Sequence, residues 1–326
     1  MNRLKLLVGV AISVALFVYL FWSVDLHELG VQLLRTRWQW VVLAVILAPL
    51  GPWTRSRRWW YLFPPRSHPP GLGPATMIGY MANNVLPLRA GEFVRVYVVA
   101  RRWGHGFWTV LATLVVERVL DSLVIVLVMA ALVLRIPVPT KLQVAALIVL
   151  AIDVAAVGTL VFLAIAPETA RRIVRQLTRR WPALEHRLLG ILETFVRGLE
   201  GVRTRAHLVP LVAWTAIIWM IQAVSAWAMF RAMSIALPWI AGWTVVAFVG
   251  LGVAVPSAPG YIGVFHAAAV LALAIFGVAP TAALGYALLY HATQIVPITL
   301  VGWVYLLREQ ITLADVSRAR PAEELG

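Results

Sequence analysis

The sequence contains no cysteine and only two lysines, Lys5 and Lys141. The absence of cysteine excludes disulfide bonds. Because lysine is so rare, nearly all of the positive charge behind the formal net charge of +14 comes from arginine. In a hydrophobic chain such charge indicates the cytoplasmic side of a membrane and its anionic inner-leaflet headgroups. We therefore expect no nucleic acid among the partners.

Several catalytic motifs are also missing. Neither lysine follows a glycine, which excludes a Walker A loop in this chain. The sequence has no His-Glu-x-x-His, Asp-x-Asp or Gly-x-Ser-x-Gly segment, so a zinc protease, a metal-dependent sugar-nucleotide site and a hydrolase elbow lack their signatures. We expect no cofactor and no metal. A transporter is favoured over an enzyme, although membrane enzymes that use carboxylates alone remain an alternative.

Long apolar runs dominate what is present. Hydrophobic residues make up 61% of the 326 residues and charged residues 13%, and several runs approach the ~20 residues that cross a bilayer. The run at 6–22 follows Arg3 and Lys5 and precedes no Ala-x-Ala site, which favours an uncleaved first span. The sequence predicts an all-α polytopic membrane protein.

The arginines predict its topology by the positive-inside rule. Arg3 and Lys5 place the N-terminus in the cytoplasm, and the cluster of Arg55, Arg57 and Arg58 follows a second span at 38–54. Further spans are predicted at 107–134, 142–166, 207–230 and 282–306. Both termini are then cytoplasmic, in a bacterial or archaeal inner membrane, with one domain over 1–310 and a tail over 311–326.

The segment 167–206 is rich in arginine and carries apolar residues at helical spacing. This pattern predicts a basic amphipathic helical segment on the inner headgroup layer. A small cytoplasmic helical cap is the alternative.

Two apolar stretches, 74–100 and 239–276, are interrupted by Pro87-Leu-Arg-Ala-Gly91 and Pro256-Ser-Ala-Pro-Gly260. By the charge rule each stretch begins and ends on one side, which predicts two re-entrant hairpins that open to opposite faces. The units 38–134 and 207–306 would be inverted repeats, as in secondary transporters with broken helices at the binding site. If each hairpin is instead two short tilted spans, the chain crosses ten times rather than six.

Ionisable residues at membrane depth are candidates for function. Arg89, Glu92 and Arg95 surround the first break, and arginine suits a phosphate because its planar fork donates two parallel hydrogen bonds. The alternative is that the two arginines pair with Glu92 or reach the interface. On the helix at 107–134 lie Glu117, Arg118 and Asp121, which either pair with those arginines or carry a proton or cation.

The second half contributes polar rather than charged candidates. Ser257 and Tyr261 flank the second break, and His291 and Gln294 share a face of the final helix, where they could line a lumen. Asp153 lies midway along 142–166 and is a candidate for coupling.

Three segments together resemble a known family. Pro87-Leu-Arg-Ala-Gly-Glu-Phe-Val-Arg95, Glu117-Arg-Val-Leu-Asp121 and Pro256-Ser-Ala-Pro-Gly-Tyr-Ile-Gly263 are similar to those of the lysylphosphatidylglycerol synthase transmembrane-region family, the flippase-like domain proteins. The resemblance covers most of the chain. It implies movement of aminoacylated phosphatidylglycerol across the bilayer, without the separate synthase domain that performs aminoacyl transfer. It also implies roles for Arg89, Glu92, Arg95, Glu117, Arg118 and Asp121.

The resulting hypothesis is an inner-membrane lipid translocase in which Arg89 and Arg95 hold the phosphate of a phospholipid or polyprenyl-linked lipid. An integral transferase or accessory subunit of lipid or glycolipid biosynthesis, with a biosynthetic enzyme as partner, is the alternative. In that case Glu92, Glu117 and Asp121 would be acid and base candidates. A scaffold without a small-molecule site is a third possibility.

Overall fold

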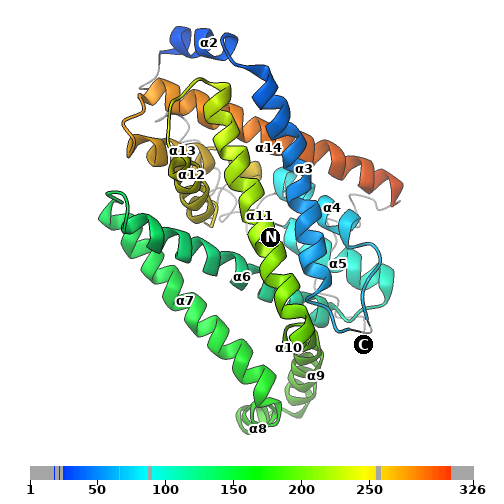
Figure 1. The fold of residues 1–326 in the computed structure, drawn as a ribbon. Helices are drawn as coiled ribbons and strands as arrows, with labels where there is room; N and C mark the ends of the chain where they lie inside the picture. The colour runs from blue at the N-terminus through cyan, green and yellow to red at the C-terminus, as the bar shows by residue number, and fades with distance from the viewer. Residues whose placement is uncertain are drawn as a thin grey trace.

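A computed structural model describes residues 25–65, 67–86, 90–254 and 258–309, together with Val18 and Trp22. The predicted span at 6–22, apart from Val18 and Trp22, and the predicted tail at 311–326 lie outside the described residues, as do Arg89 and Ser257. Within the described part, all regular secondary structure is helical (Figure 1). The first half has α2 (Leu26–Leu34), α3 (Trp38–Trp60), α4 (Leu72–Val85), α5 (Gly91–Trp103), α6 (Phe107–Val133) and α7 (Thr140–Ile165). The second half has α8 (Pro167–Thr178), α9 (Pro182–Gly198), α10 (Glu200–Arg203), α11 (Arg205–Ala232), α12 (Trp239–Gly252), the 3-10 turn η2 (Pro259–Tyr261), α13 (Val264–Ala274) and α14 (Pro280–Arg308).

The long helices confirm a polytopic all-α membrane protein. α7, α11 and α14 are each long and apolar enough to span a bilayer, and α2 with α3, bent by 84°, forms one further candidate. α6 has 27 residues, about 40 Å at ~1.5 Å per residue, which also exceeds the ~30 Å hydrocarbon core. Its three central ionisable residues set it apart from the other long helices.

α3 and α11 form an antiparallel pair through the middle of the molecule (Figure 1). At one end, the Arg37 N–H donates to the Ala232 carbonyl oxygen at 2.8 Å. At the other end, Nδ1 of His207 donates to the Tyr61 carbonyl oxygen at 2.8 Å. The two helices therefore run side by side over their whole length and define the two ends of the fold.

The two predicted hairpins enter from opposite ends of this pair. α4 and α5 begin and end beside the C-terminal end of α3, where Trp59 and Leu62 share an apolar cluster with Leu72 and Ala100. α12 and α13 begin and end beside the C-terminal end of α11, in a second apolar cluster that includes Val41, Ala232, Ala241 and Leu273. The hairpin tips meet between the ends, because α4 packs against η2.

The helix packing repeats between the two halves. α3 packs on α4 and α11 on α12, while α4 packs on α14 and α12 on α6. The hairpin pairs α4–α5 and α12–α13 correspond in the same way. This pattern is expected of inverted-topology repeats, and it agrees with the predicted units at 38–134 and 207–306.

α7 lies at the outside of the fold, against α6 and α8 (Figure 1). Apolar side chains such as Leu147, Ile152 and Val154 are mostly exposed on it, as suits a lipid-facing helix. The basic segment 167–206 is divided into α8, α9 and α10. α9 docks on the start of α6, where the Thr109 hydroxyl donates to the Thr194 carbonyl oxygen at 2.9 Å.

Candidate functional site: a buried charge cluster beside a cavity

The last turns of α3 correct one sequence interpretation. Arg55 and Arg58 were expected to follow the span at 38–54 as part of a cytoplasmic basic cluster, but α3 continues to Trp60. Arg55 is 7% exposed and Arg58 is fully buried. The interpretation was wrong for these two residues because their three-residue spacing places them on one face of a continuing helix that turns inward.

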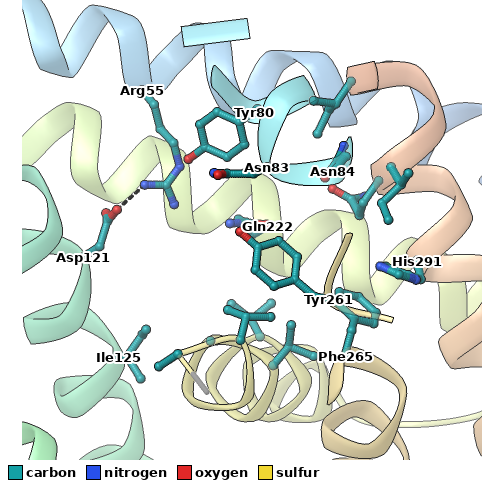
Figure 2. Close-up of a pocket in the computed structure, with 18 of the residues that line it drawn as sticks. Arg55, Tyr80, Asn83, Asn84, Asp121, Ile125, Gln222, Tyr261, Phe265 and His291 are labelled. Carbon is teal, nitrogen blue, oxygen red and sulfur yellow. Dashed lines mark hydrogen bonds and ion pairs between the residues drawn. The ribbon is translucent and has the colours of Figure 1, made fainter. Parts of the chain in front are cut away.

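That face meets the acidic residues of α6. Arg58 Nη2 donates to Asp121 Oδ1 at 2.7 Å, and Arg55 pairs with the other oxygen of the same carboxylate. Arg118 Nη2 lies 3.5 Å from Asp121 Oδ2. Asp121 is thus bound by three arginines from two helices, as Figure 2 shows for Arg55.

α5 adds the second half of the network. Arg95 Nη2 lies 3.0 Å from Glu92 Oε2 and 3.1 Å from Glu117 Oε1. Arg118 pairs with Glu117 and lies 3.5 Å from Glu92 Oε1. Of the two acids of α6, Glu117 therefore pairs with Arg95, one of the alternatives that the sequence left open, whereas Asp121 does not.

We call this set the charge cluster; its members are Arg55, Arg58, Glu92, Arg95, Glu117, Arg118 and Asp121. It has four arginines and three carboxylates, so one positive charge is in excess. Taking charges out of water is costly unless each is paired and hydrogen-bonded. The excess positive charge makes the cluster a candidate anion-binding site.

Close helix packing brings α5 to α6. A Cβ on Gly91 would lie 1.9 Å from the Gly79 carbonyl oxygen, so α4 and α5 touch through their backbones. The Arg95 guanidinium lies 4.8 Å from the centre of the Trp59 ring, whose Nε1 donates to the Thr113 hydroxyl at 2.8 Å. Arg95 is therefore held between two carboxylates and an aromatic ring.

A cavity of about 310 Å³ lies beside the charge cluster and between the hairpin tips (Figure 2). Arg55, Glu92, Arg118 and Asp121 form one part of its wall. The opposite part is mainly apolar and comes from α6, α12, α13 and α14; it includes Ile125, Val246, Val249, Phe265 and Ile298. The cavity therefore offers a charged side and an apolar side to one occupant.

The second hairpin is tied to α14 at its tip. His291 Nε2 donates to the Gly260 carbonyl oxygen at 2.8 Å. Gly260 and Tyr261 have φ angles of 67° and 60°, a left-handed conformation that is unfavourable for tyrosine. Gln294 Nε2 donates to the Ser225 hydroxyl at 3.0 Å. Tyr261, beside the second break, and His291 and Gln294, which share a face of α14, all line the cavity.

Two candidates lie elsewhere. Arg95 is 1% exposed and is not part of the cavity wall. Asp153, on α7, is 4% exposed and accepts a hydrogen bond from Ser122, but it too is outside the wall. Ser122 does line the cavity, so Asp153 reaches it only through this hydroxyl.

Sequence reasoning missed the uncharged polar side chains that line the cavity. Tyr80, Asn83, Trp219 and Gln222 line the cavity from α4 and α11. Asn83 stands next to the first break, which was an available signal, whereas nothing in the sequence around Gln222 marks it. Among the described residues, no group of three or more His, Asp or Glu side chains is arranged to hold a metal ion.

No curated protein and no solved structure matches the chain. The sequence profile described as "Lysylphosphatidylglycerol synthase TM region" matches residues 6–302, nearly the whole chain. The matched region contains both hairpins, the charge cluster and the cavity wall. The chain therefore belongs to the lysylphosphatidylglycerol synthase transmembrane-region family, a family of membrane domains associated with lipid-related functions.

Proposed function

We propose that this protein is a lipid translocase that holds the phosphate-bearing headgroup of a membrane lipid in the cavity while the acyl tails stay in the bilayer. The observation that carries the proposal is the cavity itself: it lies between two opposed hairpin tips and borders a cluster with one uncompensated positive charge. Broken helices at mid-membrane binding sites are typical of secondary transporters.

Arg118 and Arg55 are the proposed phosphate contacts within the described residues. Both line the cavity, and the Arg118 side chain, 32% exposed, is the more accessible. Guanidinium groups bind phosphate through paired, charge-assisted hydrogen bonds. Arg95 instead holds Glu92 and Glu117 in place. Arg89, which lies outside the described residues, stays a proposed phosphate ligand on sequence grounds.

The opposed hairpins suggest how the site could open to either side. Their bases lie at opposite ends of the α3–α11 pair, while their tips share the cavity. Movement of one hairpin at a time would expose the cavity to one leaflet at a time. We assign the end that carries α8 and α9 to the cytoplasm, and the membrane to the bacterial or archaeal inner membrane, because of their arginines.

The pairing of the carboxylates argues against the transferase alternative. A general acid or base must be free to exchange a proton with the substrate. Glu117 and Asp121 are each engaged by at least two arginines, and Glu92 by Arg95 and Arg118. They are better suited to orient arginines than to transfer protons.

The test is a translocation assay in proteoliposomes. Phosphatidylglycerol labelled with a fluorophore on one acyl chain is placed in both leaflets, and dithionite quenches the outer leaflet. The purified protein should increase the quenched fraction beyond that of protein-free vesicles. Arg118→Gln should slow this exchange by about tenfold or more, since a hydrogen bond to a charged group contributes about 1.5–3 kcal/mol.

The matched control is Arg172→Gln, which removes an exposed arginine of α8 far from the cavity in sequence and structure. It should leave the rate unchanged. Equal quenching with and without protein, for phosphatidylglycerol and for a polyprenyl-phosphate sugar, would refute the proposal.

A further inference from the structure

The cavity wall carries polar groups that the charge cluster does not use. Trp219 on α11 is 5% exposed, and its Nε1 has no acceptor among the described residues. Asn83 on α4 is also 5% exposed, and its Oδ1 has no donor there. Buried polar groups are nearly always hydrogen-bonded in folded proteins. Unpartnered groups in a cavity wall indicate that an occupant completes them.

Three uncharged polar side chains of the wall gather on one side of the cavity. Figure 2 shows Tyr80, Asn83 and Gln222 on the side near Arg55, while Ile125 and Phe265 lie on the opposite side. An occupant with its phosphate at the arginines would therefore place the rest of its headgroup among a phenol, two amides and the indole N–H of Trp219.

A phosphate group alone cannot satisfy all the hydrogen-bond donors and acceptors of this wall. A phosphodiester has only hydrogen-bond acceptors, which suit the N–H groups of Arg55 and Arg118. The amides of Asn83 and Gln222 each present an acceptor as well as donors, whichever way their ends are oriented. The occupant must therefore also supply donors, which are either hydroxyl groups or an ammonium group.

The charges on this wall discriminate between those two donors. The carboxylates that line the cavity are Glu92 and Asp121, and each is already bound by at least two arginines. The charge cluster keeps one positive charge in excess, so an ammonium group would meet repulsion in a region of low dielectric. Neutral hydroxyl groups have no such cost and can both donate and accept.

We propose that the headgroup bound in this cavity carries neutral hydroxyl groups next to its phosphate, as a polyol or sugar phospholipid does, and no ammonium group. This inference rests on the proposed function, because it assumes that the cavity holds a lipid headgroup. It narrows the cargo within a family whose description names an aminoacylated lipid.

The test compares five lipids with identical acyl chains in titrations followed by native mass spectrometry. Phosphatidylglycerol and phosphatidylinositol carry hydroxyl groups, and phosphatidylethanol has the same charge as phosphatidylglycerol without them. Phosphatidylethanolamine and lysyl-phosphatidylglycerol carry ammonium groups. We expect the hydroxyl lipids to bind about fivefold more tightly than phosphatidylethanol for each hydrogen bond gained, and the ammonium lipids to bind more weakly still.

Substitutions in the cavity wall test whether these residues cause the preference for hydroxyl-bearing headgroups. Trp219→Phe and, as a second variant, Gln222→Met should weaken phosphatidylglycerol binding about fivefold each while leaving phosphatidylethanol binding unchanged. Trp214→Phe is the control: it lies on the same helix, packs on Trp53 with ring centres 6.1 Å apart, and does not line the cavity. It should behave as the parent protein does.

The outcomes separate the inference from the proposed function. Equal binding of phosphatidylethanol and phosphatidylglycerol, or tighter binding of an ammonium lipid through the aromatic rings, would overturn the inference alone. Background binding of all five lipids, unaffected by Arg118→Gln, would overturn both. Displacement of phosphatidylglycerol by millimolar sn-glycerol 3-phosphate would assign the site to a free polyol phosphate and overturn its lipid part.

Discussion

Neutralising Glu117 tests the claim that the charge cluster is a single coupled network of ion pairs. Its side chain is fully buried and lies 3.1 Å from Arg95 Nη2, 3.9 Å from Arg58 Nη2 and in contact with Arg118. At 3.1 Å and an effective dielectric constant of about 20, one pair is worth about 5 kcal/mol before desolvation is counted. Loss of one partner of a buried pair costs about 3–5 kcal/mol, because the remaining charges stay buried.

We therefore expect Glu117→Gln to lower the free energy of unfolding by about 3–5 kcal/mol, measured by reversible denaturant titration of the detergent-solubilised protein. The double variant Glu117→Gln/Arg95→Gln returns the net charge of the cluster to that of the parent protein and should recover at least about 1 kcal/mol of that loss. Glu168→Gln is the control, since its side chain is 76% exposed and pairs only at the surface of α8. A loss below about 1 kcal/mol for Glu117→Gln, or strictly additive effects in the double variant, would refute the reasoning.

Two further predictions concern the fold. Gly91→Ala should destabilise the protein by more than about 2 kcal/mol, because the new Cβ would lie 1.9 Å from the Gly79 carbonyl oxygen. Gly158→Ala is the control: a Cβ at this position has no atom within 4 Å, so the substitution should be neutral or stabilising in the same unfolding titration. The chain contains no cysteine, so single cysteines at Ser67 and Arg135, in the loops after α3 and α6, should react with an impermeant maleimide from opposite membrane faces. Labelling of both from one face would contradict the placement of these two loops at opposite ends of the fold.

The helices could be predicted well because their signals are local. The expected spans at 107–134 and 282–306 agree with α6 and α14 to within two residues at each end. Length of an apolar run and the positions of proline and glycine determine whether a segment is a long helix or an interrupted one. The hairpins were found for the same reason.

The site could be predicted only in part. Tyr261 was named from its place beside the second break, and His291 and Gln294 from their shared face on the final helix; all three line the cavity. Arg55 and Arg58 were misassigned, since the positive-inside rule treats an arginine after an apolar run as solvated. A rule based on charge counts along the chain cannot tell a solvated arginine from one that turns toward an acidic partner.

The sequence by itself determined the membrane character, the broken segments and the family, because each depends on composition or on short motifs. Only the tertiary structure decided that Asp121 is bound from α3, that Arg95 lies behind the cavity wall, and that Trp219 lines the cavity with no acceptor for its Nε1 in the part of the chain that the structure describes. These facts depend on which helices far apart in the chain pack together. In a low-dielectric interior that packing determines whether a charge is compensated, and so which groups are left for a ligand.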